Sequence, residues 1–118
     1  MTETAIMPGL RLTASRAGFA LWRNNSGAFR DGTGRWIRYG LGNDSATLCR
    51  DWKSSDLVGV GPAGRFLAVE VKPPDWRYRG TPREAAQLSF LRNVVQLGGI
   101  AGFVRSDDEL LALLGCGR

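Results

Sequence analysis

Two carboxylates and a lysine fall close together in two short predicted strands. The segment 65–72 (RFLAVEVK) alternates as a strand does, which sets Glu70 and Lys72 on one face and apolar side chains on the other. The preceding predicted strand, 56–60, begins with Asp56. A pair of carboxylates suits a hard divalent cation, and a neighbouring ammonium can stabilise charge that develops on a phosphate. These residue types indicate metal-assisted hydrolysis of a phosphate ester.

The two predicted strands form a β-hairpin, and its register decides whether the carboxylates meet. A four-residue turn at 61–64 sets Asp56 opposite Val69, next to Glu70, and a single bulge would set Asp56 directly opposite Glu70. Cross-strand neighbours have Cβ atoms about 4.5–7 Å apart, close enough to share one cation. The alternative is an exposed Glu-Lys pair on a sheet face, with Asp56 an ordinary residue at the start of a strand.

The composition restricts the chemistry further. The chain has 118 residues and a formal net charge of +5, which favours polyanionic partners, nucleic acid first; a basic solvated surface is the alternative. It contains no histidine, which excludes Ser-His-Asp triads, Cys-His nucleophiles and His-ligated zinc. Acid–base or metal chemistry must therefore use carboxylates, lysine, tyrosine or water.

A regular order of helices and strands is predicted around this hairpin. Glu84 completes a capping box with Thr81, and Ser106 pairs with Glu109 in the same way, so a helix begins at each site. The predicted helices cover 3–17, 81–97 and 107–114, the predicted strands cover 19–23, 34–39, 56–60, 65–72 and 100–104, and 40–53 is expected to be a loop. This order predicts a single α/β domain over residues 1–118, with a mixed β-sheet flanked by helices.

Four segments in this order resemble the VRR-Nuc family, a branch of the PD-(D/E)XK nucleases. They are WRNNSG at 22–27, SDLVGV at 55–60, EVK at 70–72 and Gln87 on the following helix. The resemblance runs from about Glu3 to Leu114. It implies a restriction-endonuclease-like fold and a Mg²⁺- or Mn²⁺-dependent endonuclease of the stand-alone viral or bacterial type. Such relatives are associated with branched DNA and Holliday junctions.

The resemblance also implies a role for particular residues. The metal ligands would be two hairpin carboxylates, one main-chain carbonyl and an acid on the first helix: Asp56, Glu70, Val71 and Glu3. Lys72 would assist the attacking water, and Gln87 would lie over the site, so the catalytic set is Asp56, Glu70, Lys72 and Gln87. The alternatives are that Glu3 is an exposed N-terminal glutamate and that Gln87 is a polar residue flanking the packed face of its helix.

A second group of residues is expected to contact DNA. It combines the turn after the first strand, the residue before Asp56 and a basic aromatic loop: Arg23, Asn24, Asn25, Ser55, Arg77 and Arg79. The alternatives are a plain turn at 24–27 and a solvated loop at 75–80 with its Trp76 packed on the core. Further basic residues could extend this surface if they cluster: Arg30, Arg35, Arg38, Arg50 and Lys53.

Cutting both strands of a junction needs two such sites, so a homodimer is expected, with Trp22, Phe29 or Trp36 as candidate interface residues.

The chain has no signal-peptide pattern and no run of about 18 apolar residues. A cytoplasmic protein is therefore predicted, and the resemblance implies a bacterium or a virus-infected host cell. The competing functions are a non-catalytic nucleic-acid-binding protein of the same fold and a nicking, restriction-like or RNA-directed nuclease.

Overall fold

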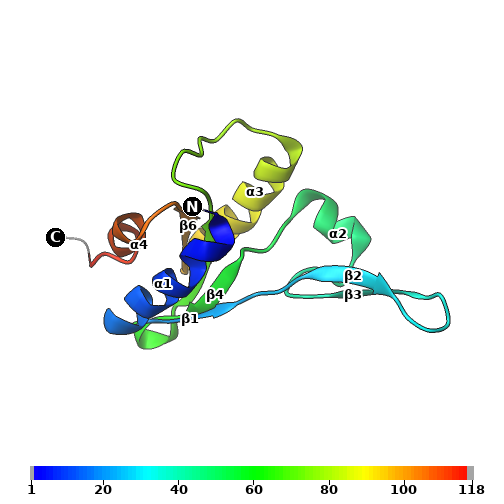
Figure 1. The fold of residues 1–118 in the computed structure, drawn as a ribbon, viewed down its shortest axis with the longest axis horizontal. Helices are drawn as coiled ribbons and strands as arrows, with labels where there is room; N and C mark the ends of the chain where they lie inside the picture. The colour runs from blue at the N-terminus through cyan, green and yellow to red at the C-terminus, as the bar shows by residue number, and fades with distance from the viewer. Residues whose placement is uncertain (1, 117–118) are drawn as a thin grey trace.

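A mixed four-stranded sheet in the order β1-β4-β5-β6 forms the centre of the molecule (Figure 1). The computed structural model describes residues 2–116, apart from the side chains of Thr4, Leu48 and Cys49. The first three strands pair antiparallel and β5 pairs with β6 in parallel. The strands are β1 (Ala20–Arg23), β4 (Leu57–Val60), β5 (Phe66–Val71) and β6 (Ile100–Val104). The prediction of an α/β fold with a mixed sheet is confirmed.

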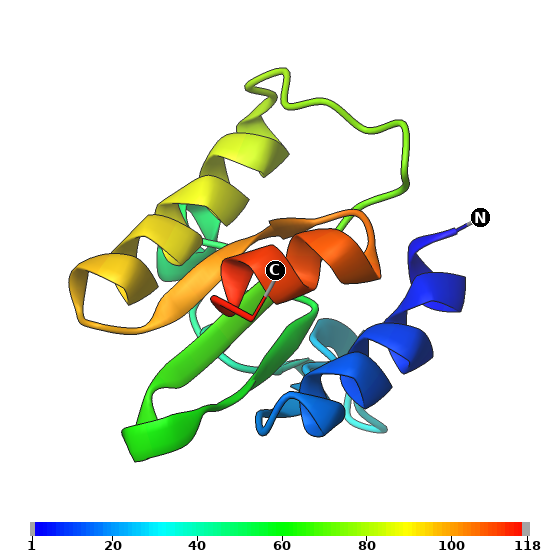
Figure 2. The same cartoon turned by 90° about the vertical axis from the view of Figure 1, so that its left-hand side faces the viewer.

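Helices cover both faces of this sheet (Figure 2). Helices α1 (Glu3–Arg16) and α4 (Asp107–Leu113) share one hydrophobic cluster with Leu67, Val69 and Val71 of β5. Helix α3 (Pro82–Gln96) packs on the opposite face, where Ala68 lies against Phe90, Leu91 and Val94. The alternation along β5 therefore places Leu67, Val69 and Val71 in one layer of the core, as predicted, and Ala68 in the other. None of the helices within residues 2–116 is long and apolar enough to cross a bilayer.

The predicted helix starts are confirmed in detail. Thr81 and Glu84 form a reciprocal capping box, in which the Thr81 hydroxyl accepts from the Glu84 N–H at 3.1 Å. The Ser106 hydroxyl accepts from the Glu109 N–H at 3.2 Å and begins α4. Helix α1 continues through Pro8, with Thr2 accepting from Ala5 N–H at its start. Glu3 therefore lies on an ordered first turn.

The region between β1 and β4 departs from the predicted elements. Strand β2 (Gly27–Arg30) was not expected; it pairs with β3 (Trp36–Tyr39) in a separate two-stranded sheet. The segment 40–53, predicted as a loop, contains the short helix α2 (Ala46–Asp51). The Trp52 ring, which follows α2, packs edge-on against Phe90 of α3 with centroids 5.1 Å apart. Tertiary packing explains this helix better than any local signal, because its six residues are too few to be stable alone.

The hairpin register also differs from the prediction. The pairs run from Leu57 opposite Val69 to Val60 opposite Phe66, so Arg65 belongs to the turn. The turn is one residue longer because Pro62–Gly64 form a 3₁₀ turn in which Ala63 and Gly64 have φ of 63° and 76°. Extending this register by one residue sets Asp56 opposite Glu70 without a bulge.

Candidate active site

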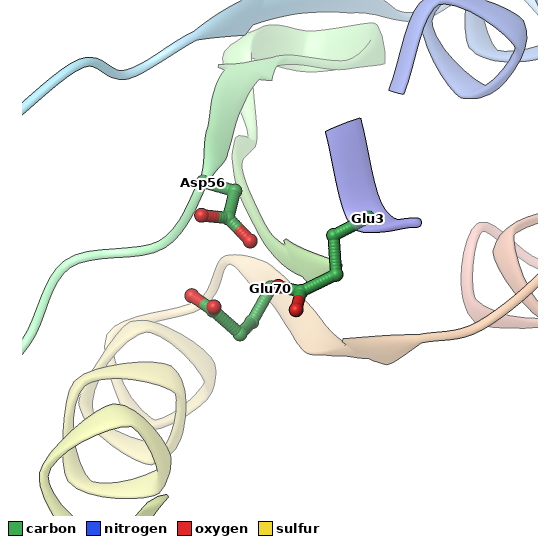
Figure 3. Close-up of side chains that lie close together, drawn as sticks. All are labelled: Glu3, Asp56 and Glu70. Atoms are coloured by element: carbon green, nitrogen blue, oxygen red, sulfur yellow. The ribbon is translucent and has the colours of Figure 1, made fainter. Parts of the chain in front are cut away.

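Three carboxylates from three different elements converge at the end of the β4–β5 hairpin (Figure 3). One oxygen from each of Glu3, Asp56 and Glu70 lies within 4.8 Å of the others. Glu3 comes from the first turn of α1, Asp56 immediately precedes β4, and Glu70 lies in β5. This is the grouping that the resemblance implies, including Glu3, whose position depends on α1 packing beside the sheet.

The Glu70 carboxyl is the most perturbed group in the cluster. Its side chain is 3% exposed, and its pKa is raised from 4.5 to about 9, first by burial and then by the charge of Asp56. Lys72 and Arg83 act in the opposite direction but do not cancel these effects. Glu70 therefore holds a proton at neutral pH when no cation is bound, because two carboxylates cannot share this site as anions at low cost.

Lys72 lies beside Glu70 on the same face of the sheet, as predicted. Its Nζ is 4.0 Å from Glu70 Oε2, and the residue is only 8% exposed. The ammonium also lies over the rings of Trp76 and Phe103, 5.5 and 5.8 Å from their centroids. The aromatic rings shield this cation from water on one side, which strengthens its interaction with any negative charge that develops beside it.

Gln87 reaches the cluster from α3. Its Nε2 donates to Glu70 Oε2 at 3.2 Å, and the residue is 2% exposed. Its Oε1 is buried without a hydrogen-bond partner, a state not found for the other side chains that the structure describes. An unpaired buried acceptor is costly unless a water or another donor reaches it. Gln87 is thus part of the site rather than a polar residue on the edge of the helix.

The main chain around Asp56 is fixed by hydrogen bonds. Asp56 Oδ2 accepts from the Val71 N–H at 3.0 Å, and the Asp56 carbonyl accepts from the Asn24 N–H at 2.8 Å. Val71 therefore contacts the site through its amide; a ligand role for its carbonyl stays a prediction. These bonds orient the Asp56 carboxylate toward Glu70.

Asn24 and Ser55 support the loop that carries Asp56. The Asn24 amide donates to the Ser54 hydroxyl at 2.9 Å and the Ser55 carbonyl at 2.8 Å, and its Oδ1 accepts from Leu41 N–H at 3.2 Å. The Ser55 hydroxyl is buried and donates to the Leu57 carbonyl at 2.8 Å. Both side chains are engaged in shaping the site, and contact of either with DNA stays a prediction.

Two adjoining pockets open onto the carboxylates. One, of about 320 Å³, is lined by Asp56, Glu70 and Gln87 together with the basic residues Arg38, Lys53 and Arg83. The other, of about 470 Å³, is lined by Asp56 and Arg83 together with Met7, Arg23, Asn24, Asn25, Ser26 and Tyr39. An acidic centre with a basic rim suits a cation bound together with a phosphodiester.

The loop between β5 and α3 does not line either pocket. Arg77 and Arg79 are exposed there, while the Trp76 Nε1 donates to Glu84 Oε2 at 2.9 Å and its ring stacks on Phe103 at 4.8 Å. Trp76 is therefore packed on the core and the two arginines are solvated, as in the alternative given for this loop. Contact of the two arginines with DNA stays a prediction.

Arg83 is a site residue that the sequence analysis missed. It is exposed on the first turn of α3, lines both pockets and lowers the pKa of Glu70. Its position four residues before Gln87 sets both on one face of the helix, and that spacing was the available signal.

We expect Arg83→Ala to weaken DNA binding about equally for all sequences. The slope of the logarithm of the binding constant against the logarithm of the salt concentration should fall by about one, because one phosphate contact is lost. Arg92→Ala is the matched control, because Arg92 is an exposed arginine of the same helix that lines neither pocket. Fluorescence anisotropy with labelled DNA at several salt concentrations measures both variants. Equal salt slopes for the two would show that Arg83 does not contact the backbone.

The carboxylate cluster fits a small hard cation. Ligands opposite one another on Mg²⁺ are about 4.2 Å apart, so oxygens within 4.8 Å need only small side-chain rotations to converge. A cation would also remove the repulsion between Asp56 and Glu70. In the comparisons with known proteins, no family model, no curated protein and no solved structure matches this chain.

Proposed function

We propose that the protein is a metal-dependent nuclease that hydrolyses phosphodiester bonds in DNA. The observation that carries this proposal is the convergence of Glu3, Asp56 and Glu70 with the buried Lys72 beside them. In the proposal the mixed sheet and its helices are a variant of the restriction-endonuclease-like fold, and the chain is a relative of the VRR-Nuc nucleases, which its motifs resemble. Mg²⁺ or Mn²⁺ is the expected cofactor.

Each residue has a defined task in this mechanism. Glu3, Asp56 and Glu70 would hold the metal, with the Val71 carbonyl as a further expected ligand. When bound, the metal would supply Lewis acidity toward the phosphate and a water of lowered pKa. Lys72 stabilises the negative charge that develops on the phosphate, and the unpaired Oε1 of Gln87 accepts a hydrogen bond from the attacking water.

The basic rim positions the substrate. Arg38 and Lys53 line one of the two pockets beside Asp56, Arg23 lines the other, and Arg83 lines both, so a phosphodiester at the site meets cations in either pocket. Such contacts hold the backbone without reading sequence. This favours a nuclease that selects DNA by its shape, and we propose branched DNA such as a Holliday junction as the substrate.

A cleavage assay with Mg²⁺, Mn²⁺ or EDTA on linear duplex, nicked, flap and four-way DNA tests the proposal. Cleavage that requires the metal and is fastest on the four-way substrate is the expected result. Metal-dependent cleavage that is fastest on another substrate would show that the protein is a nuclease with a different DNA target. Tight binding without cleavage in either metal would identify a non-catalytic nucleic-acid-binding protein.

A homodimer is the expected working form, because each chain offers one carboxylate cluster within its described residues and a junction needs two cuts. The three candidate interface residues are about half exposed: Trp22 at 51%, Phe29 at 51% and Trp36 at 55%. Light scattering should give twice the chain mass of 12.9 kDa. A monomer mass both with and without junction DNA would contradict the dimer and favour a nicking enzyme.

A further inference from the structure

The hairpin of β2 and β3 stands apart from the rest of the fold. Residues 27–39, here called the arm, pair only within their own two-stranded sheet and project from the body in Figure 1. The molecule measures 52 Å along its longest axis and 32 and 29 Å along the others. A two-stranded hairpin is marginally stable in water unless something packs on it. The arm is therefore a candidate binding element.

The two faces of the arm differ in chemistry. The register pairs Ala28 with Arg38 and Arg30 with Trp36, so these four side chains share one face, here called the Arg30 face. The opposite face carries Phe29, Ile37 and Tyr39, with the Phe29 and Tyr39 rings 6.2 Å apart. One face is thus cationic and aromatic, and the other is apolar.

The Arg30 face is continuous with the candidate active site. Ala28 and Arg38 line the pocket that contains Asp56 and Glu70. Arg30 and Trp36 form the next pair outward on the same face, about 7 Å further along, since side chains two residues apart on a strand are separated by two rises. Successive phosphates of one DNA strand advance about 3.4 Å along the helix axis, so this separation spans about two steps measured along that axis. The face leads directly away from the carboxylates.

Arg30 is held in position on this face. Its guanidinium carbon lies 5.1 Å from the centre of the Trp36 ring, and its Nη1 donates to the Gly34 carbonyl at 3.1 Å. These contacts leave most of the five N–H donors of the guanidinium for another acceptor. A stacked and tethered arginine loses less entropy when it binds a phosphate than a mobile one does.

We infer that the Arg30 face of the arm binds the phosphate backbone of DNA that flanks the reacting phosphodiester. This inference rests on the proposed function, since the flanking backbone belongs to the same substrate. Charge complementarity and continuity with the basic rim favour a polyanion over a protein partner, which would be expected to cover the apolar face first. Arg30 makes the phosphate contact and Trp36 orients it, which leaves Trp22 and Phe29 as the candidate residues of a dimer interface.

Salt-dependent binding in EDTA tests the inference without requiring cleavage. Full-length wild type, Arg30→Ala and Arg35→Ala are compared by anisotropy on fluorescein-labelled duplex and single-stranded DNA. Arg35 is the matched control, because it is exposed, its main chain pairs with Asp31 at the tip, and strand alternation places it on the opposite face. Arg30→Ala should lose about 0.9 from the salt slope on duplex and about 0.7 on single strands, and Arg35→Ala should lose none.

Two further variants separate a lost contact from a damaged arm. Arg30→Lys keeps the cation and should keep the wild-type slope. Trp36→Phe keeps a ring beneath the guanidinium and should bind more tightly than Trp36→Ala. Equal slopes for Arg30→Ala and Arg35→Ala, or an Arg30→Lys slope as low as that of Arg30→Ala, would overturn the inference. Cleavage of the same duplex by the wild type in Mn²⁺ is measured separately. If no cleavage occurs, the proposed nuclease activity is wrong, while the binding role of the arm is still decided by the salt slopes.

Discussion

Glu70→Gln should lower metal-dependent DNA cleavage by about 100-fold or more, the scale on which loss of one group that stabilises developing charge acts. The substitution removes a metal ligand but keeps the shape of the side chain and an acceptor oxygen within reach of Gln87 Nε2. It also replaces a carboxyl that is already protonated without metal, so the fold should be unharmed. Initial rates in Mg²⁺, with circular dichroism to verify folding, provide the measurement.

The control for this loss is Asp108→Asn, because Asp108 is an exposed acid on α4, outside the carboxylate cluster. It should cleave at the wild-type rate. Asp56→Asn and Lys72→Met should also lower the cleavage rate. Asp56→Asn removes a metal ligand, and Lys72→Met removes the charge that stabilises the phosphate in the transition state. If Glu70→Gln cleaves as fast as wild type in Mg²⁺, the assignment of the catalytic centre is wrong.

The sequence could predict those parts of the site where the local residue pattern is compatible with only one secondary structure. The alternation in β5 sets Glu70 and Lys72 on one face because a strand has period two, and the structure agrees. The capping residues Thr81 and Ser106 mark helix starts because their side chains satisfy main-chain donors that would otherwise be unpaired. Once α3 begins at Pro82, Gln87 follows at a fixed place on its face.

The parts that sequence could not predict depend on distant contacts or on exact turn geometry. The observed hairpin register differs from the predicted register by one residue because Arg65 belongs to the turn. The alternation of apolar and polar residues does not show where the turn ends. Helix α2 exists because Trp52 packs on Phe90, which is 38 positions further along. Strand β2 was missed because its first residue belongs to the strong turn signal at 24–27 and because it has no buried face of its own, whereas the strand at 34–39 was predicted.

The stability of the metal-free protein should fall as pH rises between 4.5 and about 9, because Glu70 titrates in that window. Its pKa is raised in the fold, so the folded state keeps a proton that the unfolded chain has already released. The stabilisation is complete below 4.5 and is lost as pH rises through about 9. Each unit of raised pKa corresponds to about 1.4 kcal/mol, so the loss should exceed that figure.

Urea unfolding of wild type and Glu70→Gln in EDTA, across the same pH window, isolates this group. The glutamine cannot titrate, so the difference between the two free energies of unfolding should shift in favour of Glu70→Gln as pH rises. Adding Mn²⁺ should reverse the trend for wild type, because the metal binds the carboxylate and its stabilisation grows as Glu70 loses its proton. Glu70→Gln should gain far less from Mn²⁺. If the difference between the two free energies of unfolding does not change with pH in EDTA, Glu70 is ionised without metal. If Mn²⁺ does not change the free energy of unfolding of the wild type, the three carboxylates do not hold a cation.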